Sequence, residues 1–108
     1  MSRYEDLNSH VTPANGVSVQ YWRVGKVAYI KAESNAVALE EESFNVLATI
    51  DTAAYRPINY IYGMGYMDKS GGRVTCETSV TSDGRVRIFN TGAAATCLVR
   101  LSLVFPMA

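Results

Sequence analysis

Apolar and polar residues alternate with a period of two along most of this chain, and this pattern restricts the fold more than any other feature. The clearest case is "RVTCETSV" at 73–80, where small or apolar residues alternate with polar ones. An extended strand with one buried face produces this period, whereas a surface helix requires a period near 3.6. The turn sequence "SDG" that follows at 82–84 is typical of a tight hairpin.

Seven segments show this alternation and are expected to form strands: 17–24, 26–33, 44–50, 58–67, 73–80, 85–89 and 96–105. Short, regularly spaced strands favour an antiparallel β-sandwich or jelly roll over a parallel sheet with crossover helices. A chain of 108 residues fits one such domain. We predict that it spans 17–108, after a polar N-terminal arm or linker stub at 1–16. An acidic loop is expected at 34–43, although 35–48 could also contain a short helical turn.

The tyrosine-rich strand at 58–67 is apolar on both faces. We expect Tyr60 and Tyr62 to line the core, with Ile61 and Met67 on the opposite face. The two glycines of "GMG" within this strand are typical of close packing or of a bulge.

The final predicted strand, 96–105, is also apolar on both faces, because Leu98 and Val104 lie opposite its main apolar face. A sheet with one side in water should be polar on that side. The strands 58–67 and 96–105 do not follow this rule, which indicates a second buried surface that either loops or an oligomer partner cover. Closed homo-oligomers are the common form of such partners.

The composition argues against two classes of partner. The formal net charge is zero, and a nucleic-acid binder needs a basic surface for phosphate contacts, so we expect no nucleic-acid partner. No segment approaches the ~20 apolar residues of a membrane-spanning helix, and "MSRYEDLNSH" at the N-terminus lacks the apolar stretch of a signal peptide. We therefore expect no membrane partner.

Residues suited to catalysis or metal binding are sparse. His10 is the single histidine and lies in the predicted arm, so a Ser-His-Asp triad is not expected. The acidic run at 40–42 could supply paired carboxylates but is more typical of a solvated loop. Cys76 and Cys97 are interpreted as small core residues, which could form a disulfide only if they face each other. We expect no enzyme, no metal and no cofactor.

Ligand binding is the remaining kind of function, and aromatic side chains with polar tips are its main candidates. Tyr66 lies near the end of its predicted strand, close to Asp68 and Arg73. An exposed ring there could stack on a sugar while the charged groups form hydrogen bonds. Trp22 is expected either on the surface or at an interface. The predicted ligand-binding residues are Trp22, Tyr66, Asp68 and Arg73.

Several short motifs follow one another in a characteristic order. An aromatic strand leads into a Gly-x-Val hairpin in "YWRVGKVAYIKAE", and a middle strand leads into a Tyr-Arg-Pro corner in "AAYRP". A later hairpin has "SDGRVRIF" as its second arm, and the apolar strand "LVRLSLVFPMA" comes last. Over 15–108, this order resembles the C-terminal head domains of phage tail-fibre, baseplate and receptor-binding proteins, especially from phages of Gram-positive bacteria.

The resemblance implies a homotrimeric jelly-roll head at the tip of a phage tail, made in the host cytoplasm and carried in the virion. Such heads bind host cell-wall saccharides without metal or cofactor, in clefts at or near subunit boundaries. Other tail or baseplate proteins are the remaining implied partners. Two alternatives stay open: a purely structural virion protein that binds no glycan, and a carbohydrate-binding module.

Overall fold

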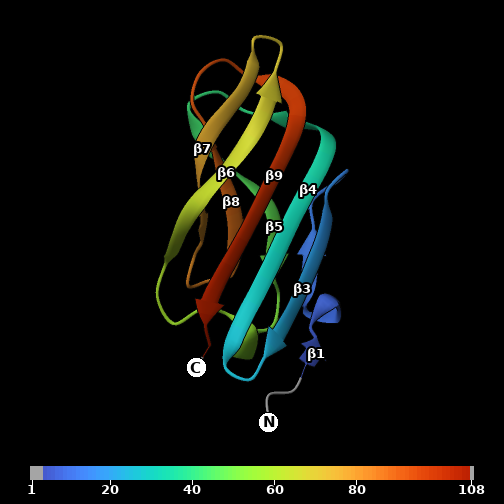
Figure 1. Ribbon diagram of the computed structural model, residues 1–108, viewed down its shortest axis with the longest axis vertical. Helices are drawn as coiled ribbons and strands as arrows, with labels where there is room; N and C mark the ends of the chain where they lie inside the picture. The colour runs from blue at the N-terminus through green and yellow to red at the C-terminus, as the bar shows by residue number, and fades with distance from the viewer. Residues whose placement is uncertain (1–3, 108) are drawn as a thin grey trace.

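The computed structural model describes residues 4–107 as one antiparallel sheet that curls upon itself into a half-barrel (Figure 1). Its elements are β1 (Tyr4–Asp6), η1 (Asn8–His10), β2 (Val11–Pro13), β3 (Ser18–Val24), β4 (Val27–Leu39), β5 (Ser43–Ile50), η2 (Ala53–Tyr55), β6 (Ile61–Lys69), β7 (Gly72–Val80), β8 (Arg85–Asn90) and β9 (Ala95–Pro106). The strand order across the sheet is β1-β3-β4-β9-β6-β7-β8-β5-β2. In Figure 1, β3, β4, β9 and β6 form the front layer, and β8 and β5 lie behind them. Within residues 4–107, no helix is long and apolar enough to span a membrane.

The all-β, antiparallel architecture predicted from the alternation is confirmed. All seven predicted strands are present, as β3 to β9, but the total is nine because the predicted arm contributes β1 and β2. The acidic loop predicted at 34–43 is shorter than expected, since β4 continues to Leu39. The alternative of a helical turn within 35–48 is wrong, because those residues lie in β4, in β5 and in the turn between them.

The described part of the predicted arm packs onto both edges of the sheet. Tyr4 in β1 lies opposite Val24 in β3, and Val11 in β2 lies opposite Ile50 in β5. Between these strands, Leu7 is fully buried in the core. One ten-residue segment, 4–13, therefore supplies both edge strands. Residues 1–3 of the predicted arm lie outside the described residues.

The inward faces predicted for β7 and β9 are confirmed. Cys76 and Val80 in β7, and Cys97 and Phe105 in β9, are all buried. The two cysteines are free thiols. Burial raises the pKa of the Cys76 thiol to about 11, so this thiol is protonated at neutral pH and acts as a small core residue.

The prediction that Tyr60 and Tyr62 line the core is wrong. Tyr60 and Tyr62 are 47% and 61% exposed, whereas Met67, which was expected on the opposite face, is fully buried. Ile61 is partly buried and also packs against the core. The tyrosines therefore lie on the outer side of the sheet.

The two glycines of β6 explain why this face turns inward. A Cβ atom at Gly63 would lie 2.3 Å from Leu103 Cδ2, and one at Gly65 would lie 2.6 Å from the Arg100 carbonyl oxygen and 2.8 Å from Thr78 Cγ2. Only a strand without side chains at these positions can approach its neighbours so closely. The glycine face therefore packs inward, and the tyrosine face is left outside.

A β-bulge changes the expected facing of β5. Strict alternation would place Phe44, Val46, Ala48 and Ile50 on one face of this strand, but the pairing of β5 with β8 shifts between Val46 and Ala48. The bulge places Leu47, Ala48 and Ile50 in the core and leaves Val46 on the outer side, 42% exposed. A single inserted residue thus reverses the facing of the first half of the strand.

The Tyr-Arg-Pro corner connects the two layers through hydrogen bonds. Arg56 Nε donates to the Ile50 carbonyl oxygen at 2.8 Å, and the buried Tyr21 hydroxyl donates to the Tyr55 carbonyl oxygen. Gly84 has a φ of +91°, and a Cβ there would lie 2.4 Å from the Ile50 oxygen and 2.8 Å from Arg56 Nε. The corner therefore needs glycine in the adjacent hairpin turn.

Candidate functional site

A row of residues with polar side chains crosses the outer face of the front layer and continues onto β7. Its members come one from each of five neighbouring strands and are successive Cα partners: Ser18 (β3), Glu33 (β4), Arg100 (β9), Tyr66 (β6) and Thr75 (β7). We call these five residues the polar row. Cross-strand partners of this kind have side chains in reach of one another, so the row forms one continuous strip of hydrogen-bonding groups.

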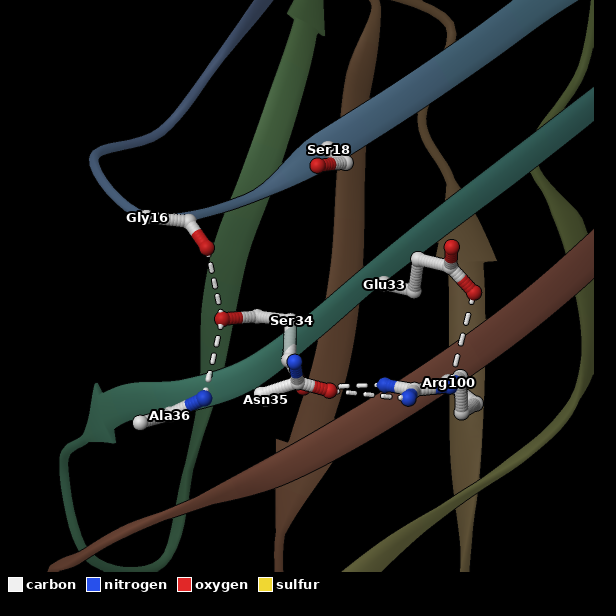
Figure 2. Close-up of a pocket in the computed structure, with 7 residues that line it drawn as sticks. All are labelled: Gly16, Ser18, Glu33, Ser34, Asn35, Ala36 and Arg100. Carbon is white, nitrogen blue, oxygen red and sulfur yellow. Dashed lines mark hydrogen bonds and ion pairs between the residues drawn. The ribbon is translucent and has the colours of Figure 1, made fainter.

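Arg100 is the best-connected member of the polar row (Figure 2). Its Nε lies 3.4 Å from Glu33 Oε2. Its Nη1 donates to the carbonyl oxygens of Ser34 at 3.0 Å and Val99 at 2.9 Å, and its Nη2 donates to Asn35 Oδ1 at 3.0 Å. These contacts hold the guanidinium in one orientation and compensate its charge.

A bulge in β4 positions Asn35 against Arg100. The pairing of β4 with β9 shifts between Ser34 and Val37. The Ser34 hydroxyl donates to the Gly16 carbonyl oxygen at 2.6 Å and accepts from the Ala36 N–H at 3.2 Å. Bulges commonly redirect a side chain in this way. This bulge was not predicted, because residues 34–43 were expected to form a loop.

Tyr66, Asp68 and Arg73 form a cluster at the β6 and β7 end of the polar row. Arg73 donates to both carboxylate oxygens of Asp68, with Nε–Oδ1 at 2.8 Å and Nη2–Oδ2 at 3.2 Å. The same guanidinium lies 4.0 Å from the centre of the Tyr66 ring, which is a cation–π geometry. The Arg73 hydrogen bonds and the charges of Arg73 and Arg100 lower the pKa of the Asp68 carboxyl. Asp68 is therefore ionised at neutral pH.

Two hollows open on either side of the Glu33–Arg100 pair. The first is about 250 Å³, lies towards β3, and is lined by Gly16, Ser18, Glu33, Ser34, Asn35, Ala36 and Arg100 (Figure 2). The second is about 590 Å³, lies towards β6, and is lined by Lys31, Glu33, Met64, Gly65, Tyr66, Arg100, Leu101 and Ser102. The larger hollow combines an aromatic wall with charged groups, which suits a polar ligand that also has apolar faces.

Trp22 lies apart from the other three predicted binding residues. It stacks on Tyr29 of β4, with ring centres 5.5 Å apart and planes 8° from parallel. Tyr29 pairs with Val104, whereas Tyr66 pairs with Arg100, four residues away along β9. At ~3.3 Å per residue this offset is about 13 Å. The structure thus brings Tyr66, Asp68 and Arg73 together but not Trp22.

Three residues of the candidate site were not among the predicted ones: Glu33, Asn35 and Arg100. Arg100 had one local signal, since it is the single charged residue in the apolar segment 96–105. Its proximity to Tyr66 depends on the pairing of β9 with β6, which no local pattern specifies.

His10 is remote from the polar row. Its Nδ1 lies 3.0 Å from Thr52 Oγ1, and its ring packs against Tyr55 at 4.3 Å between centres. Over residues 4–107, no group of three or more His, Cys, Asp or Glu side chains is arranged to hold a metal ion.

The sequence matches no protein-family model and no curated protein. The fold, however, is similar to a known structure, the head domain of the lactococcal phage bIL170, which was studied as a receptor-binding domain. The alignment covers the whole of both chains with a TM-score of 0.68 and 13% identical residues. At this identity, the similarity establishes a shared fold.

Proposed function

We propose that this chain is the head domain of a phage tail receptor-binding protein and attaches the virion to a saccharide on the host surface. The observation that carries the proposal is the similarity of fold to the bIL170 head domain over the full length of both chains. In this proposal, the chain is located at the tail tip of the virion, and its protein partners are other tail or baseplate proteins. Fold alone does not determine function, so the proposal also draws on the site.

The polar row and its larger hollow support saccharide as the ligand class. A sugar ring has apolar faces and hydroxyl edges. Arg73 covers one face of the half-buried Tyr66 ring, and the part of the ring that lines the larger hollow offers a surface for stacking. Asp68 and Arg73, next to this ring, supply hydrogen-bond acceptors and donors. The volume of about 590 Å³ is within the usual range for ligand pockets. Trp22, stacked on Tyr29, provides a second and separate contact surface in this proposal.

The proposed mechanism is multivalent attachment without catalysis. Each site binds weakly, and a homotrimer engages three sites on the same cell surface. The second and third contacts are then intramolecular, and avidity exceeds the single-site affinity by ~10²–10⁴. His10, the one histidine, lies outside the proposed site.

A panel of purified bacterial cell-wall saccharides, screened as an array and followed by calorimetric titration, tests the proposal. We expect Tyr66→Ala and Arg73→Ala each to weaken binding about tenfold, or ~1.4 kcal/mol. Arg85→Ala is the matched control, because the Arg85 side chain is as exposed as that of Arg73, 59% in each, and Arg85 lies on β8, away from the polar row and from Trp22. Unchanged affinity in both site variants would remove the site assignment, and absence of binding across the panel would remove the function.

A structural virion protein is the second candidate, and the exposed side chains of β6 favour it. Tyr62 and Met64 are 61% and 62% exposed, which is typical of a surface that contacts another protein. An array without signal, together with tight binding to a tail or baseplate protein of the same phage, would support this candidate over the first.

A further inference from the structure

A second outer surface of the sheet is aromatic and apolar. It consists of six side chains: Phe44 and Val46 from β5, Phe89 from β8, Tyr62 and Met64 from β6, and Tyr60 just before β6. We call these six residues the apolar face. In Figure 1, β6 and β7 lie at the left with β8 behind them, and β5 lies next to β8, behind β9. Two of the six, Tyr62 and Met64, are more than 60% exposed.

The apolar face is continuous across four strands. Tyr62, Ser79, Arg87 and Val46 are successive Cα partners on β6, β7, β8 and β5. Tyr60 extends this row, with its ring centre 6.3 Å from that of Tyr62. Beside this row, Phe44 and Phe89 pack edge to face with ring centres 4.9 Å apart, and Met64 lies two residues from Tyr62 on β6. The surface is therefore a single patch, and not a scatter of exposed residues.

One arginine lies within the apolar face without a carboxylate partner. The Arg87 guanidinium carbon lies 4.0 Å from the Phe44 ring centre and 5.8 Å from that of Tyr60. Its Nε donates to Ser79 Oγ at 3.0 Å, and Ser79 is fully buried beneath it. Within residues 4–107, Arg87 forms no ion pair. Its charge is thus held rigidly between two rings with no charge opposite it.

One glutamate lies on the same outer side and is also unpaired. Glu77 is exposed on β7 and lies directly opposite Met64 of β6. It is two residues along β7 from Ser79, which is the residue opposite Arg87. The described residues place no ion-pair partner within 4 Å of its carboxylate. The patch therefore has one cation and one anion that do not contact each other.

We infer that the apolar face packs against a second copy of this chain, with Arg87 of one copy paired to Glu77 of the next. In a closed ring of copies, Arg87 of each copy pairs with Glu77 of the next copy, and its Glu77 pairs with Arg87 of the previous copy, so both charges are satisfied. Exposed rings and a central arginine are also the residue types that dominate binding energy at protein interfaces. The polar row contributes no residue to this contact, and Met64 is the one member of the apolar face that also lines the larger hollow.

This inference deepens the homotrimer part of the proposed function by naming the contact surface. It does not depend on what the polar row binds. Association and saccharide binding can be measured separately, so a failure of one does not imply a failure of the other.

Sedimentation equilibrium over a concentration series tests the pairing. We expect the unmodified chain to associate, and Arg87→Glu and Glu77→Arg each to weaken association at least tenfold, because each places like charges opposite each other. The double variant R87E/E77R should recover most of the loss, since it restores opposite charges across the contact. Lys26→Glu is the matched control, because Lys26 is exposed in the β3–β4 turn, and it should leave association unchanged.

The apolar part of the contact is tested by Tyr62→Ser, with Tyr4→Ser on β1 as the control. We expect Tyr62→Ser to shift the equilibrium towards monomer, with a thermal melt to verify that the variant is folded. A monomeric unmodified chain would overturn the inference. Association that is unaffected by Tyr62→Ser and by both single charge reversals would also overturn it, because the contact would then lie elsewhere.

Discussion

At the scale of single residues, two glycines decide which side of β6 faces outward. Gly65 lies next to Arg100 and Tyr66 in the sheet, and its missing side chain allows β6 to approach the Arg100 backbone. Without that close approach, Tyr66 could not occupy its place in the polar row. The position of Tyr66 therefore depends on the absence of a side chain at Gly65.

We predict that Gly65→Ala lowers the free energy of unfolding by about 1–3 kcal/mol, because the new Cβ collides with backbone that cannot move away. Gly63→Ala should cost less, since its nearest contact is the end of the Leu103 side chain. Gly71→Ala is the control, because no atom lies within 4 Å of that position. Urea denaturation of the three variants measures the difference, and equal stability of Gly65→Ala and Gly71→Ala would contradict the prediction.

A second prediction at this scale concerns the Asp68–Arg73 pair. The pKa of the Asp68 carboxyl is lowered from its ordinary value of 3.8 by the Arg73 hydrogen bonds first and by nearby positive charge second. The pair is therefore fully formed above the ordinary carboxyl pKa and is lost as the pH falls through the lowered value. An NMR titration of the carboxyl carbon should show this lowered pKa, and Arg73→Ala should raise it. An Asp68 pKa that is the same in both proteins would show that the pair does not form in solution.

At the scale of elements, the N-terminal segment is the most informative part of the fold. The segment 4–13 supplies the strands at both edges of the sheet, β1 and β2. Edge strands expose unpaired backbone groups, and β3 and β5 would be the edges without this segment. The segment also places Leu7 in the core, where its N–H donates to the Tyr21 carbonyl oxygen at 2.8 Å.

Leu7→Ala should therefore destabilise the protein by about 2–5 kcal/mol, the usual range for a buried leucine. Tyr4→Ala, in the neighbouring strand β1, removes a side chain that is 67% exposed and should cost far less. Guanidinium denaturation followed by tryptophan fluorescence measures both variants. A loss below ~1 kcal/mol for Leu7→Ala would mean that the segment is not anchored in the core as described.

At the scale of the whole molecule, the proposed functions occupy different surfaces. The polar row crosses the front layer, from β3 to β7, whereas the apolar face runs from β6 around to β5. The two surfaces meet at β6, where Met64 borders the larger hollow and also belongs to the apolar face. When copies of the chain associate through the apolar face, their polar rows are therefore held in a fixed arrangement.

This arrangement predicts a difference between surface binding and solution binding. In the Arg87→Glu variant, binding to immobilised host saccharide should weaken by ~10²–10⁴, because avidity is lost. Calorimetric titration with a short soluble saccharide should give the same single-site affinity as the unmodified protein. A parallel loss in both measurements would indicate that Arg87 acts on the ligand site and not through association.

Local sequence patterns were sufficient for the class of fold and for the position of most strands. Alternation and hairpin turns are short-range signals, and they correctly predicted seven strands and the buried faces of β7 and β9. They also placed Tyr66, Asp68 and Arg73 close together, because a single hairpin, β6 to β7, joins these residues.

Tertiary packing decided the remaining features. Alternation shows that the two faces of a strand differ, but where both are apolar, as in β6, only the packing of Gly63 and Gly65 selects the inner one. The bulges in β4 and β5 depend on partners far away in sequence. Arg100 lies next to Tyr66 for the same reason, since β9 pairs with β6 although two strands, β7 and β8, lie between them in the sequence. Contacts between distant segments are absent from any local pattern, and they define both the candidate site and the apolar face.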